Sequence, residues 1–591
     1  MSSIGTRWGC ACLCALAWVS SAVGAAPPIQ DWAAISPGGT GDAIAQFGSN
    51  TPPINKRALA VDAAGNSYVT GCVNNGSNWD YLTQKFDANG VLLWSARYNG
   101  PGNSTDFALA LALDGNGDVV VTGWSMGNGT GNDYATLKYS GATGTPLWTT
   151  LPGNAARYNN APFNNDDGAF ALALDANGDV VVTGRSTGGS TSYDYATLKY
   201  SGATGAPLWT TLPGNAARYN GPGNGWDSAS ALAMDSNGDV IVTGNSAGSG
   251  TDNDYATLKY AGTNGAPLWT TLPGNAARYN GSGNGNDGAV ALAVDASGDV
   301  LVAGASNGSG TSWDYATLKY AGADGAPLWT TLPGNAARYN GPGNSTDQAY
   351  ALALDGNGDL RVAGTRRGSV NDDFGLIRYT GSNGAEVWVA SEGTTGLPER
   401  FSSSNRVLAV DTAGNSYLTG SAYNGSNTDY LTQKFDANGV LLWSAQFNGS
   451  GNGDDHASAL ALDGNGDVVV TGSSFGNGTN NDYATLKYAG ATGAPLWTTL
   501  PGNAARYNGP GNNNDEGYAL ALDTTGDVVV TGFSAGSGTS GDYATLKYDG
   551  TTGAPKWTTL PGNAARYNGP GNGNDGAIGL ALDADGDVVV T

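Results

Sequence analysis

Three observations predict an all-β protein made of repeated four-stranded sheets. A unit of about sixty residues recurs along the chain and is clearest at residues 171–209. The 94 glycines and the 13% of charged residues are typical of many turns between short strands. Regularly spaced Val, Leu, Tyr and Trp residues supply the hydrophobic core that a disordered chain lacks.

The four strands of the unit can be placed in chain order. Ala-Leu alternation up to Asp175 indicates a first strand, Asn177-Gly178 a tight turn, and residues 180–182 (VVV) a second strand. The segment 194–200 (DYATLKY) predicts a third strand, and a glycine-rich turn separates it from a fourth strand that begins at residues 208–209 (LW).

The repeat predicts a β-propeller built from tandem four-stranded blades. The Asp that opens the third strand recurs every 53–61 residues, which is the size of one blade. The Asp of the first turn recurs ten times, at Asp62, Asp114, Asp175, Asp235, Asp295, Asp355, Asp411, Asp463, Asp523 and Asp583. One blade cannot bury both of its faces, so neighbouring blades must stack around an axis.

The motifs resemble those of the bacterial seven-bladed β-propeller (SBBP) repeat family. The resemblance rests on residues 61–71 (VDAAGNSYVTG), 194–200 (DYATLKY), the LW that follows, and 218–224 (RYNGPGN). It covers nearly all of the chain after about residue 57. It implies a propeller fold and an exported protein, and it brings no catalytic residues. A six-residue insertion between Trp and Arg in the longer units departs from the family pattern.

A higher-order repeat suggests two propellers in tandem. Residues 80–94 return unchanged at 429–443, and the irregular stretch 391–405 precedes the second copy. We expect a first propeller of about six blades at 27–400 and a second, incomplete one at 401–591. One large ring is the alternative, although ordinary propellers have about 4 to 8 blades. The chain stops inside the second strand of the tenth hairpin, which suggests a truncated C-terminus, unless the Trp32 region completes the last blade.

The N-terminal sequence predicts export. Residues 1–26 combine Arg7, an apolar run and small residues before the expected cleavage site, as in a secretory signal peptide. Removal of this segment leaves Cys72 as the single cysteine, so no internal disulfide can form. No later segment approaches the ~20 apolar residues of a membrane-spanning helix. The protein is expected to be secreted, periplasmic or at the cell surface.

Charge and histidine content exclude several function classes. The net charge of −24 argues against nucleic acid and anionic lipid as partners, because both are bound through Lys and Arg clusters. Catalysis by histidine is disfavoured because His456 is the single histidine. We expect no catalytic residues and no cofactor. A carboxylate-dependent glycan hydrolase or lyase is the alternative.

Repeated Asp and Lys residues are interpreted as structural. Eight of the ten lysines lie in third strands, which predicts partly buried cations paired with nearby Asp residues. An Asp eight residues before the turn Asp occurs in eight units and is expected to hold a loop through backbone N–H groups. The turn Asp175-Ala-Asn177-Gly-Asp179 resembles the start of a calcium hairpin but lacks its later Gly and Asp, so these residues are only weak calcium candidates.

A candidate binding face follows from the positions that vary between copies. They lie after the second strand or before the third, on the side that carries the longer loops, whereas the framework repeats almost unchanged. The selected residues are Trp79, Trp124, Arg185, Tyr193, Trp313 and Phe533. Exposed aromatics among Asn, Ser and Gly suit a carbohydrate or protein ligand. Neutral drift at loop tips and a purely structural surface array are the other readings.

Overall fold

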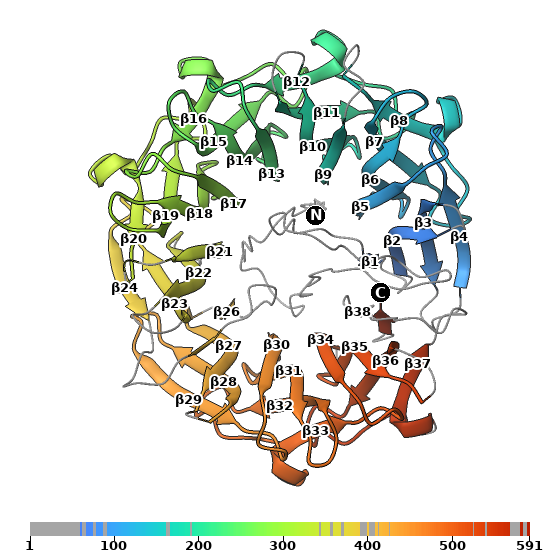
Figure 1. The fold of residues 1–591 in the computed structure, drawn as a ribbon, viewed down its shortest axis with the longest axis vertical. Coiled ribbons are helices and arrows are strands. Elements are labelled where there is room, and N and C mark those ends of the chain that lie inside the picture. The colour runs from blue at the N-terminus through green and yellow to red at the C-terminus, as the bar shows by residue number, and fades with distance from the viewer. Residues whose placement is uncertain are drawn as a thin grey trace, which may run out of the picture.

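The computed structural model is a ring of small antiparallel sheets around a central axis (Figure 1). It describes residues 59–590 with gaps at 62–66, 75–77, 87–91, 161–165, 189–191, 342–343, 345, 355–357, 368–371, 391–398, 401–407, 412, 425, 524, 538–540, 559, 568–579 and 583–587. Eight of the ten described sheets have four strands, one has five and the last has two. The predicted all-β propeller fold is confirmed. The expected signal peptide 1–26 and Trp32 lie outside the described residues.

The strands follow the ring in chain order. Blade 1 comprises β1 (Leu59–Val61), β2 (Ser67–Asn74), β3 (Trp79–Phe86) and β4 (Leu92–Tyr98), and blade 2 comprises β5 (Asp106–Leu113), β6 (Val119–Met126), β7 (Asn132–Tyr139) and β8 (Ala155–Tyr158). Blade 3 comprises β9 (Asp167–Leu174), β10 (Val180–Thr187), β11 (Tyr193–Tyr200) and β12 (Ala216–Tyr219), and blade 4 comprises β13 (Asp227–Met234), β14 (Val240–Ala247), β15 (Asn253–Tyr260) and β16 (Ala276–Tyr279). Blade 5 comprises β17 (Asp287–Val294), β18 (Val300–Asn307), β19 (Trp313–Tyr320) and β20 (Ala337–Tyr339).

The second half of the ring repeats this order. Blade 6 comprises β21 (Gln348–Leu354), β22 (Leu360–Arg367), β23 (Asp372–Tyr379) and β24 (Glu386–Ala390), and blade 7 comprises β25 (Glu399–Arg400), β26 (Leu408–Val410), β27 (Ser416–Tyr423), β28 (Thr428–Phe435) and β29 (Leu441–Phe447). Blade 8 comprises β30 (Asp455–Leu462), β31 (Val468–Phe475), β32 (Asn481–Tyr488) and β33 (Ala504–Tyr507), and blade 9 comprises β34 (Asp515–Leu522), β35 (Val528–Ala535), β36 (Gly541–Tyr548) and β37 (Ala564–Tyr567). Blade 10 comprises β38 (Leu580–Leu582) and β39 (Val588–Val590).

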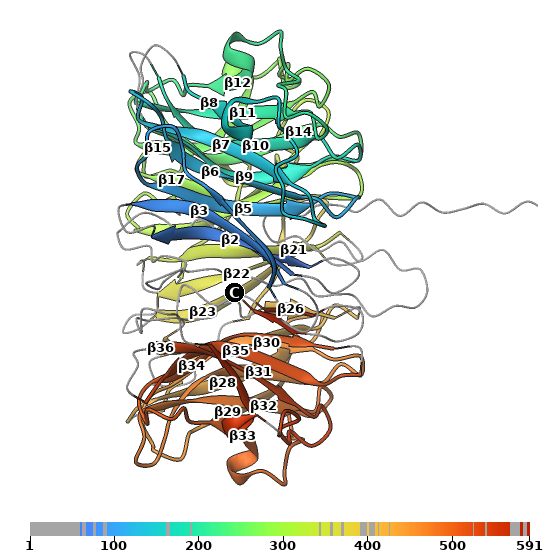
Figure 2. The same ribbon diagram turned by 90° about the vertical axis from the view of Figure 1, so that its right-hand side faces the viewer.

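Each first strand lies nearest the axis and each fourth strand lies at the perimeter (Figure 1). Turned by 90°, the blades form a single thick layer (Figure 2). The loop between the third and fourth strands of the longer units carries a short 3₁₀ turn, as in η2 (Pro213–Asn215). Equivalent turns are η1 (Pro152–Asn154), η3 (Pro273–Asn275), η4 (Pro333–Asn335), η5 (Pro501–Asn503) and η6 (Pro561–Asn563).

The fourth strand of the longer units begins later than the sequence suggests. In blade 3 it starts at Ala216, and Leu208 and Trp209 precede it in the connection. The Trp209 side chain packs into the junction with blade 4 and is fully buried. The six-residue insertion therefore lies in a loop, as expected, but it also shortens the outer strand from seven residues in β4 to four in β12.

The inner hairpins are fixed by side-chain and backbone constraints. Asp175 Oδ1 accepts hydrogen bonds from the backbone N–H groups of Asn177 (2.8 Å) and Asp179 (2.9 Å), which closes the turn. Gly178 has φ +79°, a conformation that glycine adopts without strain. The pairing of β9 with β10 shifts by one residue between Thr183 and Gly184 of β10. A Cβ added at Gly184 would lie 2.0 Å from the Gly168 carbonyl oxygen. Glycine is therefore required at this close approach.

The hydrophobic core lies between blades and not within them. At the junction of blades 3 and 4, Tyr195 and Trp209 pack against Val240 and Val242 of the next blade. All four side chains are fully buried. Each blade thus hides the face of its neighbour, which is the stacking that the repeat requires.

The lysines of the third strands join each blade to the next. Lys199 Nζ pairs with Asp175 Oδ2 of its own blade at 2.7 Å and donates to the Gly262 carbonyl oxygen of blade 4 at 2.8 Å. Trp209 Nε1 donates to the same carbonyl oxygen at 3.3 Å. The predicted buried Lys–Asp pair is confirmed here, and it recurs in blades 2, 4, 5, 8 and 9.

The arginines of the fourth strands form a second inter-blade link. Arg218 pairs with Asp194 at 2.6 Å and donates to Ser186 Oγ in its own blade. It also donates to the Tyr158 hydroxyl of the preceding blade at 2.8 Å. The same Arg–Asp pair occurs at Arg157, Arg278, Arg338, Arg506 and Arg566.

The chain forms one ring across residue 400. Arg361 of blade 6 donates to the Gly414 carbonyl oxygen of blade 7 at 2.6 Å, and Trp388 Nε1 donates to the Ala437 carbonyl oxygen at 3.0 Å. At the far end, β38 contacts β1 (Figure 1). This arrangement differs from the two propellers, 27–400 and 401–591, that the sequence favours. The repeated segments are copies of one blade type, and the junction chemistry between blades 6 and 7 resembles that of the other junctions.

No helix within the described residues has the length and apolar character needed to span a bilayer.

Candidate ligand-binding face

The varying positions lie on one flank of each blade. Arg185 and Trp124, which the sequence placed after the second strand, are the sixth residues of β10 and β6. Each pairs with the second residue of the first strand, as in Gly168–Arg185 and Phe107–Trp124. The same positions pair with the tyrosine of the third strand, as in Arg185–Tyr195, and that tyrosine donates to the next blade. These side chains therefore lie at the junction of two blades, on the side of the ring that carries the second-to-third-strand loops, and are partly buried.

One junction carries an arginine enclosed by aromatic rings. The Arg185 guanidinium lies 4.5 Å from the Tyr193 ring centre, 4.9 Å from Trp226 and 5.4 Å from Phe170. The Tyr193 and Trp226 rings are themselves 5.2 Å apart. Such contacts are attractive because the ring faces carry negative charge density. We call Phe170, Arg185, Tyr193 and Trp226 the Arg185 cluster.

Three elements of blade 3 and the entry to blade 4 position the cluster. Phe170 lies on β9, Arg185 on β10 and Tyr193 at the start of β11. Trp226 directly precedes β13, and its backbone forms an isolated parallel bridge with Tyr193. The Phe170 side chain is buried, whereas 41% of the Trp226 side chain is exposed. The cluster thus has a fixed base and an exposed aromatic edge.

Arg185 differs from the fourth-strand arginines in its partners. Six of the fourth-strand arginines each pair with an Asp of their own blade. Within the described part of the chain, Arg185 contacts aromatic rings and has neither a carboxylate at ion-pair distance nor a hydrogen-bond acceptor. Its N–H groups lie in the plane of the guanidinium and have no oxygen acceptor among the described residues. They are the donors that this site can offer to a ligand.

The cluster occurs at one of the described junctions. The equivalent positions at the next junction are polar in all four cases, namely Ser230, Asn245, Asn253 and Asn286. There the Asn253 N–H donates to Asn286 Oδ1 at 3.4 Å, in the place of the Tyr193–Trp226 contact. The junction therefore closes without aromatic side chains, so the fold does not require the cluster.

The six residues selected from the sequence are distributed over five blades. Arg185 and Tyr193 meet in the cluster, and Trp124 lies beside it: its ring is 4.5 Å from Phe107, and its Cβ lies near Gly168 of blade 3. Trp79, Trp313 and Phe533 belong to blades 1, 5 and 9 and lie elsewhere on the ring. The Phe533 ring lies over Gly541 of its own blade.

Two cluster residues were not selected from the sequence. Phe170 lies in the first strand, within the Ala-Leu alternation, where an aromatic residue is typical of core packing. Trp226 lies in the inter-blade loop, in the GNGWD segment that varies between copies. Alignment of the copies at the Asp that follows would have revealed it, because Asp166, Asn286 and Asn514 occupy the same place.

The calcium candidates use their oxygens within the fold. Asp175 binds two backbone N–H groups through Oδ1 and Lys199 through Oδ2, and Asp179 Oδ1 accepts from the Gly202 N–H at 2.9 Å. Within the described ranges, no three His, Cys, Asp or Glu side chains gather as metal ligands would. The turn is therefore held by protein hydrogen bonds.

The repeated carboxylates at the first residue of the first strands also hold loops, as predicted. Asp227 Oδ2 accepts from the Gly221 N–H at 2.7 Å, and Oδ1 accepts from the Ala247 N–H at 2.8 Å. Burial raises the pKa of Asp227, and it raises the pKa of the equivalent Asp515 to about 6. His456 Nδ1 lies 3.2 Å from Ser421 Oγ of the preceding blade. These contacts assign the groups structural roles.

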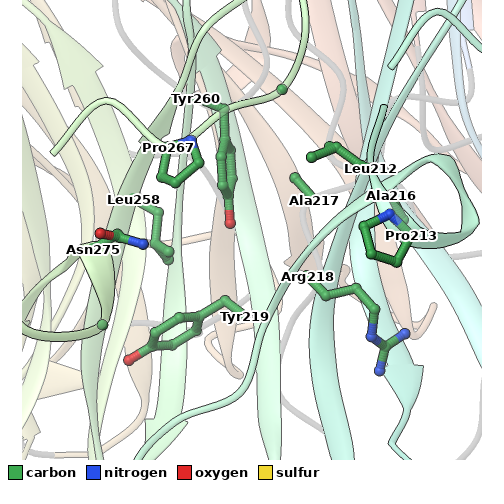
Figure 3. A pocket seen from close by; sticks show the side chains of 12 residues that line it. Leu212, Pro213, Ala216, Ala217, Arg218, Tyr219, Leu258, Tyr260, Pro267 and Asn275 are labelled. Atoms are coloured by element: carbon green, nitrogen blue, oxygen red, sulfur yellow. The ribbon is translucent and has the colours of Figure 1, made fainter. Parts of the chain in front are cut away.

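A separate hollow lies on the perimeter between blades 3 and 4 (Figure 3). Its volume is about 260 Å³, and Leu212, Pro213, Leu258 and Pro267 form part of its apolar lining. Among the described residues, the buried Tyr260 hydroxyl has no hydrogen-bond partner, as is also true of its equivalents Tyr139, Tyr200, Tyr320, Tyr379, Tyr488 and Tyr548. Because this feature recurs around the ring, it belongs to the framework.

The sequence matches no family model and no curated protein. Solved structures similar to the chain include the propeller of Dos1 (10% identity, 70% of this chain and 91% of that chain, TM-score 0.35) and the β-propeller domain of the trilobed protease from Pyrococcus furiosus (8%, 64% and 95%, 0.28). A polysaccharide lyase, an ulvan lyase, is also similar (12%, 79% and 97%, 0.32). With these identities and TM-scores, the likeness concerns the fold and carries no argument about ligands. The chain is a β-propeller repeat protein.

Proposed function

We propose that the protein is an exported, non-catalytic binding module whose propeller face, centred on the Arg185 cluster, takes a carbohydrate or protein ligand at the cell surface. Export rests on the signal-like residues 1–26. Membership of the SBBP repeat family is part of the proposal and rests on the recurring DYATLKY and RYNGPGN motifs.

The Arg185 cluster carries this proposal because it is singular within a repetitive framework. A rigid scaffold that presents one diversified set of loop and strand-end residues is a common design for binding. Trp226 adds exposed aromatic surface that the junction does not need for folding, as the polar junction between blades 4 and 5 demonstrates. Aromatic and arginine side chains are also the types that contribute most to binding energy.

A binding screen with a matched variant tests the proposal. The mature chain and Trp226→Asn, which installs the residue of the next junction, are applied to a glycan array and to surface proteins of the source cell. We expect at least one ligand whose binding drops about thirtyfold in Trp226→Asn, since loss of a central aromatic contact costs about 2 kcal/mol. Circular dichroism and thermal unfolding should match between the two proteins.

The control is Trp313→Asn, which removes an aromatic residue at the position equivalent to Tyr193 but two blades away. It should leave binding unchanged. Equal binding by all three proteins would place the ligand elsewhere and remove the cluster from the proposal. Turnover of a bound glycan would contradict the non-catalytic assignment.

A further inference from the structure

We infer that the ligand of the Arg185 cluster is an acidic saccharide, whose carboxylate or sulfate group pairs with the edge of the guanidinium while a sugar ring lies on Trp226. This inference rests on the proposed binding function and specifies the ligand class.

The state of Arg185 is the first argument. A partly buried guanidinium has lost part of its hydration, and in this site aromatic rings contact it without a counter-anion among the described residues. The rings attract the cation, but they offer its N–H groups no oxygen acceptor. An oxyanion that approaches in this plane would make two parallel charge-assisted hydrogen bonds, the geometry for which guanidinium is best suited.

The second argument compares Arg185 with the other cations of the ring. Most described blade-core cations pair with an Asp of their own blade, as Lys199 does with Asp175 and Arg218 with Asp194. Lys434 contacts the Tyr417 ring but also donates to the Gly490 carbonyl oxygen at 2.8 Å. In a protein with a net charge of −24, acidic side chains are abundant. Arg185 nevertheless contacts three aromatic rings and, among the described residues, has neither a carboxylate nor a carbonyl oxygen as partner. Asn245 occupies the same position in blade 4, which demonstrates that the framework does not need a cation there.

The size and chemistry of the site favour a sugar over an acidic peptide. One cation and one exposed indole, the 41% exposed Trp226, match one charged pyranose ring, whereas a stable protein interface buries about 800 Å² on each partner. The long-range field of the protein repels polyanions, but salt screens it within about 8 Å at physiological ionic strength, so a local pair can form.

The test compares oligogalacturonate, its methyl ester and sulfated carrageenan oligosaccharides by calorimetry with the full mature chain. We expect binding of the uronate or the sulfated glycan and at least about tenfold weaker binding of the methyl ester, in line with the strength of charge-assisted hydrogen bonds. Arg185→Asn should weaken the binding of acidic glycans about ten- to hundredfold. Arg185→Lys should give an intermediate loss of affinity, because lysine keeps the charge but not the planar pair of N–H donors. Trp313→Asn serves as the folded control.

The outcomes separate this inference from the proposed function. Binding of neutral and acidic glycans with equal affinity, unchanged in Arg185→Asn but lost in Trp226→Asn, overturns the acidic-saccharide assignment and leaves the binding module intact. Binding of poly-glutamate but of no glycan also overturns it and indicates a protein ligand. No binding to glycans, poly-glutamate or surface proteins overturns both. The inference is supported if the methyl ester alone fails to bind and Arg185→Asn weakens the binding of the acidic glycans only.

Discussion

Lys259→Met should loosen one junction of the ring while the rest stays intact. Lys259 Nζ pairs with Asp235 Oδ2 at 2.7 Å and donates to the Gly322 carbonyl oxygen of blade 5 at 2.7 Å. The side chains of Lys259 and Asp235 are 7% and 3% exposed. Methionine fills a similar volume but leaves the Asp235 carboxylate buried without its cation.

The expected cost follows from the bonds that remain. Loss of one partner of a buried ion pair costs about 3–5 kcal/mol. Asp235 keeps two backbone N–H donors on Oδ1, from Asn237 and Asp239, and the Gly322 carbonyl oxygen keeps Trp269 Nε1 at 3.3 Å. We therefore expect the low end, about 3 kcal/mol. The double variant Lys259→Met/Asp235→Asn should recover part of this loss, since the unpaired charge is gone.

Hydrogen exchange followed by mass spectrometry measures the effect locally. Protection should fall in β14, β15, β17 and β18 and stay constant in blades 8 and 9, because sub-global opening reports local stability. Lys556→Met is the matched control: this lysine pairs with Asp527 but its side chain is 42% exposed, so its loss should change exchange little. Unchanged protection around blades 4 and 5 in Lys259→Met would refute the assigned role of the lysines.

Two further predictions concern single side chains. Tyr260→Phe should leave the free energy of unfolding unchanged or raise it, because its buried hydroxyl has no partner among the described residues. Tyr255→Phe should lower the free energy of unfolding by about 1 kcal/mol, because the Tyr255 hydroxyl donates to the Ala316 carbonyl oxygen at 3.2 Å. Urea unfolding compares the two variants, and an equal loss of stability in both would contradict the reasoning. Burial raises the pKa of Asp515 to about 6 from 3.8, so the folded chain holds this proton more tightly, and the stability from this group is present below pH 4 and is lost as the pH rises through 6. The loss should reach at most about 3 kcal/mol, and unfolding of Asp515→Asn between pH 4 and 7 should lack it; parallel pH profiles of the two proteins would argue against the raised pKa.

Strand pattern and local chemistry were predictable because they depend on short-range rules. The DxNGD turn, the alternation of the first strand and the third-strand lysines each have a meaning within one copy, and the structure confirms the Lys199–Asp175 pair. The fourth strand was misplaced because Trp209, which is typical of a strand, instead turns into the junction. The number of blades in a ring depends on the angle between neighbouring blades, which no local motif encodes.

The candidate face was predictable only in part for the same reason. Arg185 and Tyr193 stand out by variation between copies, but their meeting with Phe170 and Trp226 depends on packing between two blades. Trp79, Trp313 and Phe533 satisfy the same sequence criterion, yet lie in other blades. Variation thus identifies positions that tolerate change, whereas proximity in the ring determines which of them can act together.

The uniform junctions have a consequence for how such a chain can change its length. In blades 2, 3, 4, 5 and 8 the third-strand lysine neutralises a carboxylate of its own blade and donates to one backbone oxygen of the next. At these junctions the link depends on the neighbour's main chain and not on its side chains. Unequal recombination between near-identical copies would join two blades that had never been adjacent, and the new seam would find the same acceptor in place. Ring circumference can therefore vary by whole blades during evolution, while residues such as Arg185 diverge in single copies.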